Sequence, residues 1–495
     1  MFKDFKSLLL NPKALFFKNI GTKQTVIKNT FWLTLSEAIT GFLKFIFVIY
    51  VAKILGATEY GKFSFALSFV TIVVILSEMG LPDIITREFS KNKESEKDYP
   101  AILSFKLFLS LICFILMVGG AFFITSDPII RVSIIVLGIF ILITSFLNVI
   151  CAFFRAREKM EYESVFKITQ HLFLIFSSFI VLFFIPSVKN LSYAYLFSNL
   201  VILIITLLFF NFFVSRIKLY YDKKIWHKFF KFSWPLSPGF VIGWIYVSLT
   251  SIMLGYFGYN IENGWYNAAY KIIGALAISA TLVSRSFFPV LSRFSKESKI
   301  KIQRIWNYQE ALMAILSFPM IMGGIILAPQ IINLFYDASY NPSILAFQWL
   351  VIVCGIDFMY YPYASSLVVF GREKVNFVLI VIGLIINIIL NFIFIPKYTL
   401  YGAVLSTTIS SVVVFLLAIV CAKIYTPISP FNIGTLKILL SIIISALIMF
   451  IFLFKIQIYE PNLFLSIFLG AGVYFLTLLV FYKIFNNNFL KWKRL

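Results

Sequence analysis

The chain has 495 residues, of which 61% are hydrophobic, 19% aromatic and 13% charged, and its formal net charge is +22. A soluble domain carries roughly 25% charged residues, so this composition excludes an ordinary soluble protein and indicates an integral membrane protein. Apolar stretches of about 20 residues, the length of a membrane-spanning helix, recur along the whole chain. The four cysteines fall in apolar stretches without a paired spacing, which favours neither a disulfide framework nor a thiolate metal site.

The N-terminal segment, residues 1–30, is basic and lacks the continuous apolar core and cleavage site of a secretory signal. We expect a retained cytoplasmic segment, and a basic tail fits it better than an amphipathic helix on the membrane surface. After this segment, hydropathy windows of about 19 residues predict an all-α protein with about fourteen transmembrane helices. These spans lie near residues 31–53, 63–85, 101–125, 129–153, 163–185, 191–214, 233–257, 264–290, 304–328, 343–369, 375–395, 400–422, 435–454 and 461–482.

The loops between these spans alternate between strongly basic and weakly basic. The positive-inside rule therefore predicts a multi-pass protein of the plasma (inner) membrane with both termini in the cytoplasm. The most basic loop, RIKLYYDKKIWHKFFK at 216–231, is a topology determinant first; anionic lipid headgroups are candidate ligands there, and nucleic acid is not expected. The outside loops hold Lys53, Lys62, Arg131, Lys189, Lys397 and Lys455.

Three loop sequences of the first half recur in the second half at similar offsets. Six spans separate the copies, so spans 1–6 and 7–12 form a parallel repeat, and such repeats place the substrate path between the halves, near the midplane. The repeat predicts an N-lobe at 31–215, a basic linker at 216–231, a C-lobe at 232–423, and spans 13 and 14 with a basic tail at 424–495. The pairs are LGATEYGKFSFALSF (55–69) with FGYNIENGWYNAAYKI (257–272), RAREKMEY (155–162) with GREKVNF (371–377), and IPSVKNLSYAYL (185–196) with IPKYTLYGAVL (395–405).

At these motifs the chain resembles the polysaccharide flippases, the Wzx-type transporters of O-antigen and related lipid-linked oligosaccharides, within the multidrug/oligosaccharidyl-lipid/polysaccharide (MOP) exporter superfamily. The chain departs from the family pattern late in span seven. An acidic residue is expected there, but this chain reads VSLTSIML (247–254), which argues against a cation-linked role for that position. The resemblance also rests on SEMGLPDIITREFS (77–90), FRAREKMEYESVFK (154–167), SWPLSP (233–238) and NIILNFIFIPKYTLYGAVLSTTIS (387–410).

The resemblance implies a MATE-like fold, with two six-helix lobes around a central cavity and two further C-terminal helices. It implies a transporter that works by alternating access and carries an undecaprenyl- or dolichyl-pyrophosphate-linked sugar outward. Membrane lipids surround such a protein, and polysaccharide polymerases or glycosyltransferases are candidate partners. No cofactor or metal is expected, although H⁺ or Na⁺ coupling stays open.

Apart from residues within two positions of a predicted boundary, five basic residues fall inside the predicted spans, where charged side chains usually face a wet cavity or a partner. Lys44 lies near the centre of span one and is the strongest candidate for a cavity, followed by Lys271 in span eight. Lys106, Lys167 and Arg285 lie near the predicted cytoplasmic ends of their spans, so they either face the cavity or extend to the interface.

Glu37 and Lys44 share one face of span one but are about 10 Å apart along its axis, so they cannot pair directly. Gly41 lies between them and leaves space for water or ligand, which predicts that span one lines a cavity. The first repeat offset maps Lys44 onto Tyr246 and Glu37 onto Gly239, so these charges have no counterpart in span seven.

Asp357 is the deepest acid of the second half. It either pairs with Lys44 or Lys271 or titrates as a coupling site. Pro235 and Pro238 open span seven, where each removes a helix donor, so a hinge and a fixed bend are both expected interpretations.

His171 and Gln170 could line the same space as the charges, or serve structure alone. A pyrophosphate needs cations along its path, and aromatic rings can pack against the faces of sugar rings. Aromatic residues also gather in girdles at the two membrane interfaces, which is the alternative explanation for them. The aromatic candidates are Trp244, Tyr246, Tyr266 and Tyr270.

Three other functions compete with the flippase. A membrane glycosyltransferase or polymerase needs acids in a substantial outer loop, and the predicted outer loops are short, so we expect no enzyme. A cation-coupled multidrug exporter of the same superfamily would bind cationic ligands instead, and a lipid II-type flippase differs only in its passenger.

Overall fold

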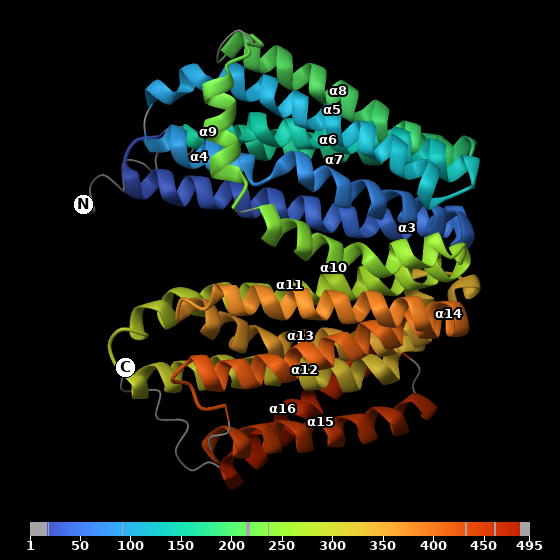
Figure 1. The fold of residues 1–495 in the computed structure, drawn as a ribbon. Coiled ribbons are helices and arrows are strands. Elements are labelled where there is room, and N and C mark those ends of the chain that lie inside the picture. The colour runs from blue at the N-terminus through green and yellow to red at the C-terminus, as the bar shows by residue number, and fades with distance from the viewer. Residues whose placement is uncertain are drawn as a thin grey trace. The chain divides into compact units, whose positions relative to one another are not determined.

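The computed structural model describes residues 17, 19–91, 93–213, 218–235, 237–430, 433–459 and 462–485. The described chain is built from α-helices and short 3₁₀ turns, without a β-strand, which confirms the all-α class (Figure 1). Helices suit a hydrocarbon medium because each satisfies its backbone N–H and C=O groups within the segment. Most of the predicted basic N-terminal segment and the C-terminal tail lie outside the described residues.

The helices form two compact units, Met1–Ser248 and Leu249–Leu495, and the division falls within α10 (Ser237–Tyr256). The boundaries expected for lobes, linker and C-terminal helices stay predictions. Unit 1 also contains α3 (Thr22–Glu78), α4 (Leu81–Lys91), η1 (Lys93–Asp98), α5 (Tyr99–Ile124), α6 (Pro128–Ala156), α7 (Met160–Phe184), α8 (Val188–Phe213) and α9 (Lys223–Ser233). Unit 2 contains α11 (Asn260–Phe294), α12 (Lys299–Phe335), η2 (Ala338–Tyr340), α13 (Ser343–Val369), α14 (Glu373–Tyr425), α15 (Ile433–Tyr459) and α16 (Leu463–Phe485).

Helix α3 doubles back on itself at Gly56, whose φ of 72° and ψ of 168° are not helical. Its first residues lie at the end of unit 1 where α6 ends, since Lys28 Nζ is 2.8 Å from Glu161 just beyond α6. Its middle lies at the opposite end, where Lys62 Nζ is 3.1 Å from Asp127 at the start of α6. We call the end where α6 ends the basic end of unit 1.

Helix α14 makes the same reversal at Thr399, with φ 47° and ψ −116°. Asn387 Nδ2 donates to Ser410 Oγ across the resulting hairpin at 3.1 Å. The two halves approach so closely that a Cβ at Gly402 would overlap the carbonyl group of Phe394, so glycine is required there.

Twelve helices in the described part of the chain are long and apolar enough to cross a membrane. Helices α3 and α14 have 57 and 53 residues, more than twice the roughly 20 residues that one crossing requires. Because each folds back on itself, each has the length for two crossings. The number of fourteen crossings stays a prediction.

Two of the predicted repeat loops contain equivalent backbone turns. Gly56 and Gly258 both have positive φ, 72° and 82°, and they are separated by the predicted offset of 202 residues. In the second pair, the positive φ angles fall at Glu158 (57°) and Gly371 (70°). When the two REK sequences are aligned, these two residues are offset by two positions. Both loops of the second pair therefore contain a turn with positive φ, although the turns do not fall at aligned positions.

In unit 2, α15 and α16 pack against α12, where they share a buried cluster around Leu327, Met449 and Leu453. Tyr474 OH of α16 donates to the carbonyl of Ile315 at 3.1 Å, which anchors the last helix. In lipid such packing contacts and interhelical hydrogen bonds, rather than water exclusion, hold helices together.

Candidate substrate-binding site

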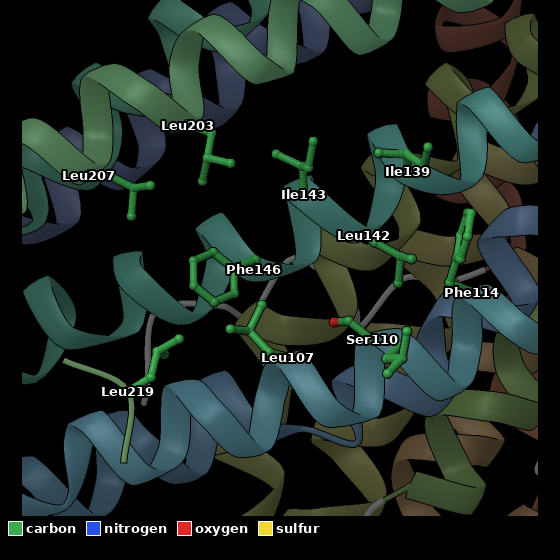
Figure 2. A pocket seen from close by; sticks show the side chains of 11 residues that line it. Leu107, Ser110, Phe114, Ile139, Leu142, Ile143, Phe146, Leu203, Leu207 and Leu219 are labelled. Atoms are coloured by element: carbon green, nitrogen blue, oxygen red, sulfur yellow. The ribbon is translucent and has the colours of Figure 1, made fainter. Parts of the chain in front are cut away.

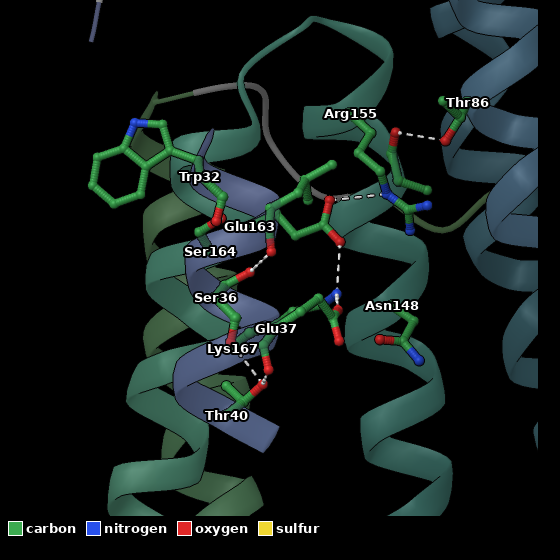
Figure 3. Close-up of polar contacts among 12 residues, drawn as sticks. Trp32, Ser36, Glu37, Thr40, Thr86, Asn148, Arg155, Glu163, Ser164 and Lys167 are labelled. Atoms are coloured by element: carbon green, nitrogen blue, oxygen red, sulfur yellow. Dashed lines mark hydrogen bonds and ion pairs between the residues drawn. The ribbon is translucent and has the colours of Figure 1, made fainter. Parts of the chain in front are cut away.

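The main charged cluster of unit 1 joins α3 to α7 near the basic end. Glu163 and Lys167 are one turn apart on α7, and Lys167 Nζ lies 3.1 Å from Glu163 Oε1. The same ammonium lies 3.2 Å from Glu37 Oε1 on α3, so the lysine bridges two carboxylates (Figure 3). Lys167, which the sequence could assign either to a cavity or to the interface, is thus held between two helices.

Arg155, at the end of α6, extends this cluster. Its Nε lies 2.9 Å from Glu163 Oε2 (Figure 3). A second guanidinium nitrogen lies 3.7 Å from Asp83 of α4. We call Glu37, Lys167, Glu163, Arg155 and Asp83 the charge ladder. The Glu163 side chain is 2% exposed, whereas that of Glu37 is 69% exposed. The ladder therefore has a buried centre and an open end at Glu37.

Lys44 lies two turns beyond Glu37 on α3 and is exposed. Among the described residues it forms no hydrogen bond or ion pair, and Glu37 pairs with Lys167 instead, which agrees with the spacing argument. The charge of Lys44 still lies close enough to interact with Glu37, Lys167 and His171. The open end of the ladder therefore carries an unpaired ammonium.

Two further polar residues of α7 belong to the same region. His171 Nδ1 lies 2.7 Å from the carbonyl oxygen of Lys167, one turn earlier. Gln170 Nε2 donates to Asn199 Oδ1 of α8 at 2.9 Å, and Asn199 in turn donates to Thr144 of α6 at 2.6 Å. Gln170 thus serves helix packing, while His171 extends the polar face of α7.

Lys106 is fully buried and does not extend to the interface. Its ammonium donates to the carbonyl and the hydroxyl of Ser77, at 2.6 and 2.9 Å, and to Ser145 Oγ at 2.6 Å. These three bonds join α5 to the second half of α3 and to α6. Its transport role stays a prediction, and the geometry describes a packing contact.

Lys28 at the start of α3 is a buried cation that sequence reasoning missed. It contacts Glu161 at 2.8 Å, Asn19 Oδ1 at 2.6 Å and the carbonyl of Glu158 at 3.3 Å. It precedes the predicted first span, so it was not counted as an intramembrane charge. Glu161 and Glu163, the two acids in the first turn of α7, are the sequence signal that indicates a partner for Lys28.

In unit 2, Asp357 on α13 and Arg285 on α11 are both exposed. The two helices pack directly, with Ser284 and Ser365 hydroxyls 3.0 Å apart, and Tyr361 lies within electrostatic reach of both charges. Asp357 forms no ion pair with any described residue of unit 2, Lys271 included. One of the alternatives for Asp357, a pair with Lys271, is not formed in this conformation, while a pair with Lys44 and titration as a coupling site stay predictions.

The aromatic candidates are divided between buried and exposed positions. Tyr266 is buried and stacks on Tyr270 with ring centroids 5.8 Å apart, on the same helix as the exposed Lys271. Trp244 is exposed on α10, and Tyr246 on that helix is partly exposed. Trp244 therefore presents the most open ring of the four.

The two prolines expected in a hinge lie just before α10 and in its first turn. Pro235 lies between α9 and α10, and Pro238 is the second residue of α10. Proline is tolerated in the first turn because that N–H has no helical acceptor. The prolines therefore mark the start of α10, and a hinge there stays a prediction.

Glu310 on α12 is a second buried charge that sequence reasoning missed. It is 2% exposed and accepts a hydrogen bond from Tyr363 OH of α13 at 2.7 Å. Glu310 lies in the predicted span 304–328, and an acid in an apolar segment is as strong a signal of function or pairing as a base. The described residues hold no group of three or more His, Cys, Asp or Glu placed to bind a metal ion.

Comparison with known proteins places these features in a family. Residues 26–295 match the family described as polysaccharide biosynthesis protein. The capsular polysaccharide biosynthesis protein CapF of Staphylococcus aureus is 23% identical over 404 residues, which cover 78% of this chain and 97% of CapF.

Solved structures show the same fold. The lipid II flippase MurJ, in an inward closed conformation, matches 92% of this chain and 99% of its own with a TM-score of 0.69 and 18% identity. An inward-facing multidrug resistance MATE transporter of the MOP superfamily matches 80% of this chain and 98% of its own, with a TM-score of 0.62 and 15% identity. Because the family match spans more than half of the residues, the chain belongs to the polysaccharide biosynthesis protein family.

Proposed function

We propose that this protein is a flippase of the MOP exporter superfamily that carries a polyprenyl-pyrophosphate-linked oligosaccharide from the cytoplasmic to the outer leaflet by alternating access, for assembly of a cell-surface polysaccharide or glycan. The family match and the name of CapF support a polysaccharide pathway. The plasma (inner) membrane, cytoplasmic termini and partnership with polymerases or glycosyltransferases belong to this proposal.

The unpaired ammonium of Lys44 carries the proposal. A cation within an apolar helix is costly, and such residues are usually retained where they meet a cavity, a partner or a passing ion. Lys44 forms no ion pair among the described residues and lies beside the exposed end of the charge ladder. An anionic pyrophosphate would supply the missing negative charge.

Lys167 of the charge ladder becomes a second cation for the headgroup if the headgroup replaces Glu37 as its partner. Glu37 is largely exposed, so its ion pair with Lys167 is expected to contribute only about 0.2–1 kcal/mol. A pyrophosphate carries more charge than one carboxylate and would displace Glu37 from Lys167. Lys44 and Lys167 would then bind the headgroup together, while the buried pair of Glu163 and Arg155 keeps α7 in place.

A multidrug exporter is the second candidate, and two exposed carboxylates favour it. Glu37 and Asp357 would suit an organic cation, and the fold is shared with a multidrug MATE transporter. Asp357 forms no ion pair with the described residues of unit 2, so it is also our candidate for H⁺ or Na⁺ coupling.

The test is transport in proteoliposomes that contain equal amounts of inserted wild type or Lys44→Ala. A fluorescent polyprenyl-pyrophosphate oligosaccharide and a fluorescent organic cation are offered separately. We expect the wild type to flip the lipid-linked sugar and Lys44→Ala to lose at least about 90% of the rate, because a lost charged contact of about 1.5–3 kcal/mol is tenfold or more.

The matched control is Lys53→Ala, an exposed lysine one turn from Gly56 on the same helix, which should leave transport unchanged. Efflux of the organic cation without flipping of the sugar lipid would contradict the proposal and favour the drug exporter. Flipping that is equal in wild type and Lys44→Ala would remove Lys44 from the site but leave the flippase function standing.

A further inference from the structure

A separate apolar groove runs over α5, α6 and α8 of unit 1, with a volume of about 580 Å³. Helix α6 forms its floor with Leu142 and Phe146, and α5 and α8 form its walls (Figure 2). Leu107 and Phe114 come from α5, and Leu203 comes from α8. The groove is deep enough for a hydrocarbon chain, and almost all of the side chains along it are apolar.

The end of this groove nearest the basic end is built by the segment before α9. Leu219 lines the groove itself, and the next residue is fixed because Ser104 Oγ of α5 donates to the carbonyl of Tyr220 at 2.6 Å. Trp226 of α9 donates through Nε1 to the carbonyl of Ala101 at 3.0 Å. The indole also contacts the rings of Phe105 and Phe108 on α5, with centroids 5.4 and 5.1 Å apart.

Exposed cations gather at this same end. Lys218 directly precedes Leu219, and Lys223 and Lys224 form the first turn of α9; all three are exposed. Asp222 is committed to capping α9, since its carboxylate accepts from the N–H groups of Lys224 and Ile225 at 2.7 and 3.2 Å. The apolar groove therefore ends at a short segment, 218–224, that carries three exposed lysines, and this combination matches a lipid with an anionic head.

We propose that this groove binds one anionic phospholipid, with an acyl chain between α5 and α8 and its phosphate at Lys218, Lys223 and Lys224. The open end of the charge ladder, Glu37 and Lys167, lies on α3 and α7, whereas the residues that line the groove lie on α5, α6 and α8 and in the segment before α9. A passenger whose headgroup sits at Lys44 would need its chain near α3, so the lipid in the groove is a resident lipid. The site stands independently of the transported substrate.

The test is photo-crosslinking of the purified full chain with a phosphatidylglycerol that carries a diazirine in one acyl chain. A phosphatidylcholine with the same chain is the comparison probe. We expect phosphatidylglycerol to label peptides covering residues 107–114 and 139–146 at least about threefold more strongly. Combined Lys218→Gln, Lys223→Gln and Lys224→Gln substitutions should remove this preference, whereas Lys231→Gln, an exposed lysine late in α9, should keep it.

A groove-filling variant tests the chain-binding part. Leu107→Trp places a bulky ring in the groove from a partly exposed position and should reduce labelling severalfold. Ile115→Trp is the matched control, because Ile115 is exposed on the same helix outside the groove and its replacement should change nothing. Equal labelling by both lipids, equal loss in both tryptophan variants, or displacement of phosphatidylglycerol by a polyprenyl phosphate would each overturn the proposal.

Discussion

The two units treat their charges differently. In unit 1, Lys167 and Arg155 are joined through the buried carboxylate of Glu163, and the ladder ends in the open Glu37 beside the unpaired Lys44. In unit 2, Asp357 is exposed on α13 and forms no ion pair with described residues of that unit. A charge that is buried and paired positions helices, whereas an exposed charge without a partner is available to a ligand or a proton.

The largest expected effect comes from the centre of the ladder. Glu163→Gln leaves Arg155 and Lys167 without their shared carboxylate, and loss of one member of a buried ion pair costs up to about 3–5 kcal/mol. Both cations are partly exposed, so we expect the free energy of unfolding to fall by about 2–3 kcal/mol. Denaturant unfolding of the protein in mixed micelles measures this change.

Glu88→Gln is the control for that experiment, because among the described residues Glu88 forms an ion pair with the neighbouring, exposed Arg87 and with no other cation. Its effect should stay below about 0.5 kcal/mol. Equal effects of the two substitutions would show that the ladder does not organise unit 1.

A smaller effect is expected at Asp127, in the connection between α5 and α6. Burial opposes ionisation of this carboxylate, but the N–H of Ile129 and the ammonium of Lys62 outweigh it, so the pKa of Asp127 lies below its ordinary value. A lowered folded-state pKa stabilises the protein above the ordinary carboxyl pKa, and this contribution disappears as the pH falls through the folded-state value.

Asp127→Asn should therefore reduce stability near neutral pH by about 0.5–1 kcal/mol and have no effect at a pH where the carboxyl is protonated. Unfolding curves of wild type and variant across acidic pH measure the difference. A constant difference at every pH would show that the cap, and not the charge, stabilises this end.

The smallest effect on stability is expected at Asp357. Without an ion pair to lose, Asp357→Asn should change the free energy of unfolding by less than about 0.5 kcal/mol. If Asp357 is the coupling site, transport by the variant should lose its dependence on pH or Na⁺. A destabilisation as large as that of Glu163→Gln would remove the contrast between the two units.

Much of the fold could be predicted because it depends on local sequence. Apolar segments of sufficient length identify helices, and Gly56 and Gly258, which lie in the first pair of recurring loop sequences, both adopt positive φ. The spacing of Glu37 and Lys44 correctly excluded a direct pair, because helix geometry fixes the distance between two positions on one helix.

Partners from other helices could not be predicted in this way. Lys167 contacts Glu37 across 130 positions of sequence, and Lys106 meets Ser77 and Ser145 on two different helices. Apolar membrane helices are similar enough that the hydrophobic pattern does not specify which faces meet. Glu310 is a different case, because an acid inside an apolar segment is visible in the sequence, although its partner Tyr363 on another helix is not.

The most direct test of the central claim is the affinity of the purified protein for a polyprenyl pyrophosphate without sugar. We expect Lys44→Ala to raise the Kd roughly 10- to 100-fold, because a hydrogen-bonded charge pair contributes about 1.5–3 kcal/mol. Lys44→Arg, which keeps the charge, should stay within severalfold of wild type, and added salt should weaken binding by wild type more than by Lys44→Ala. An unchanged Kd in Lys44→Ala would contradict the assignment of Lys44 as the residue that binds the pyrophosphate.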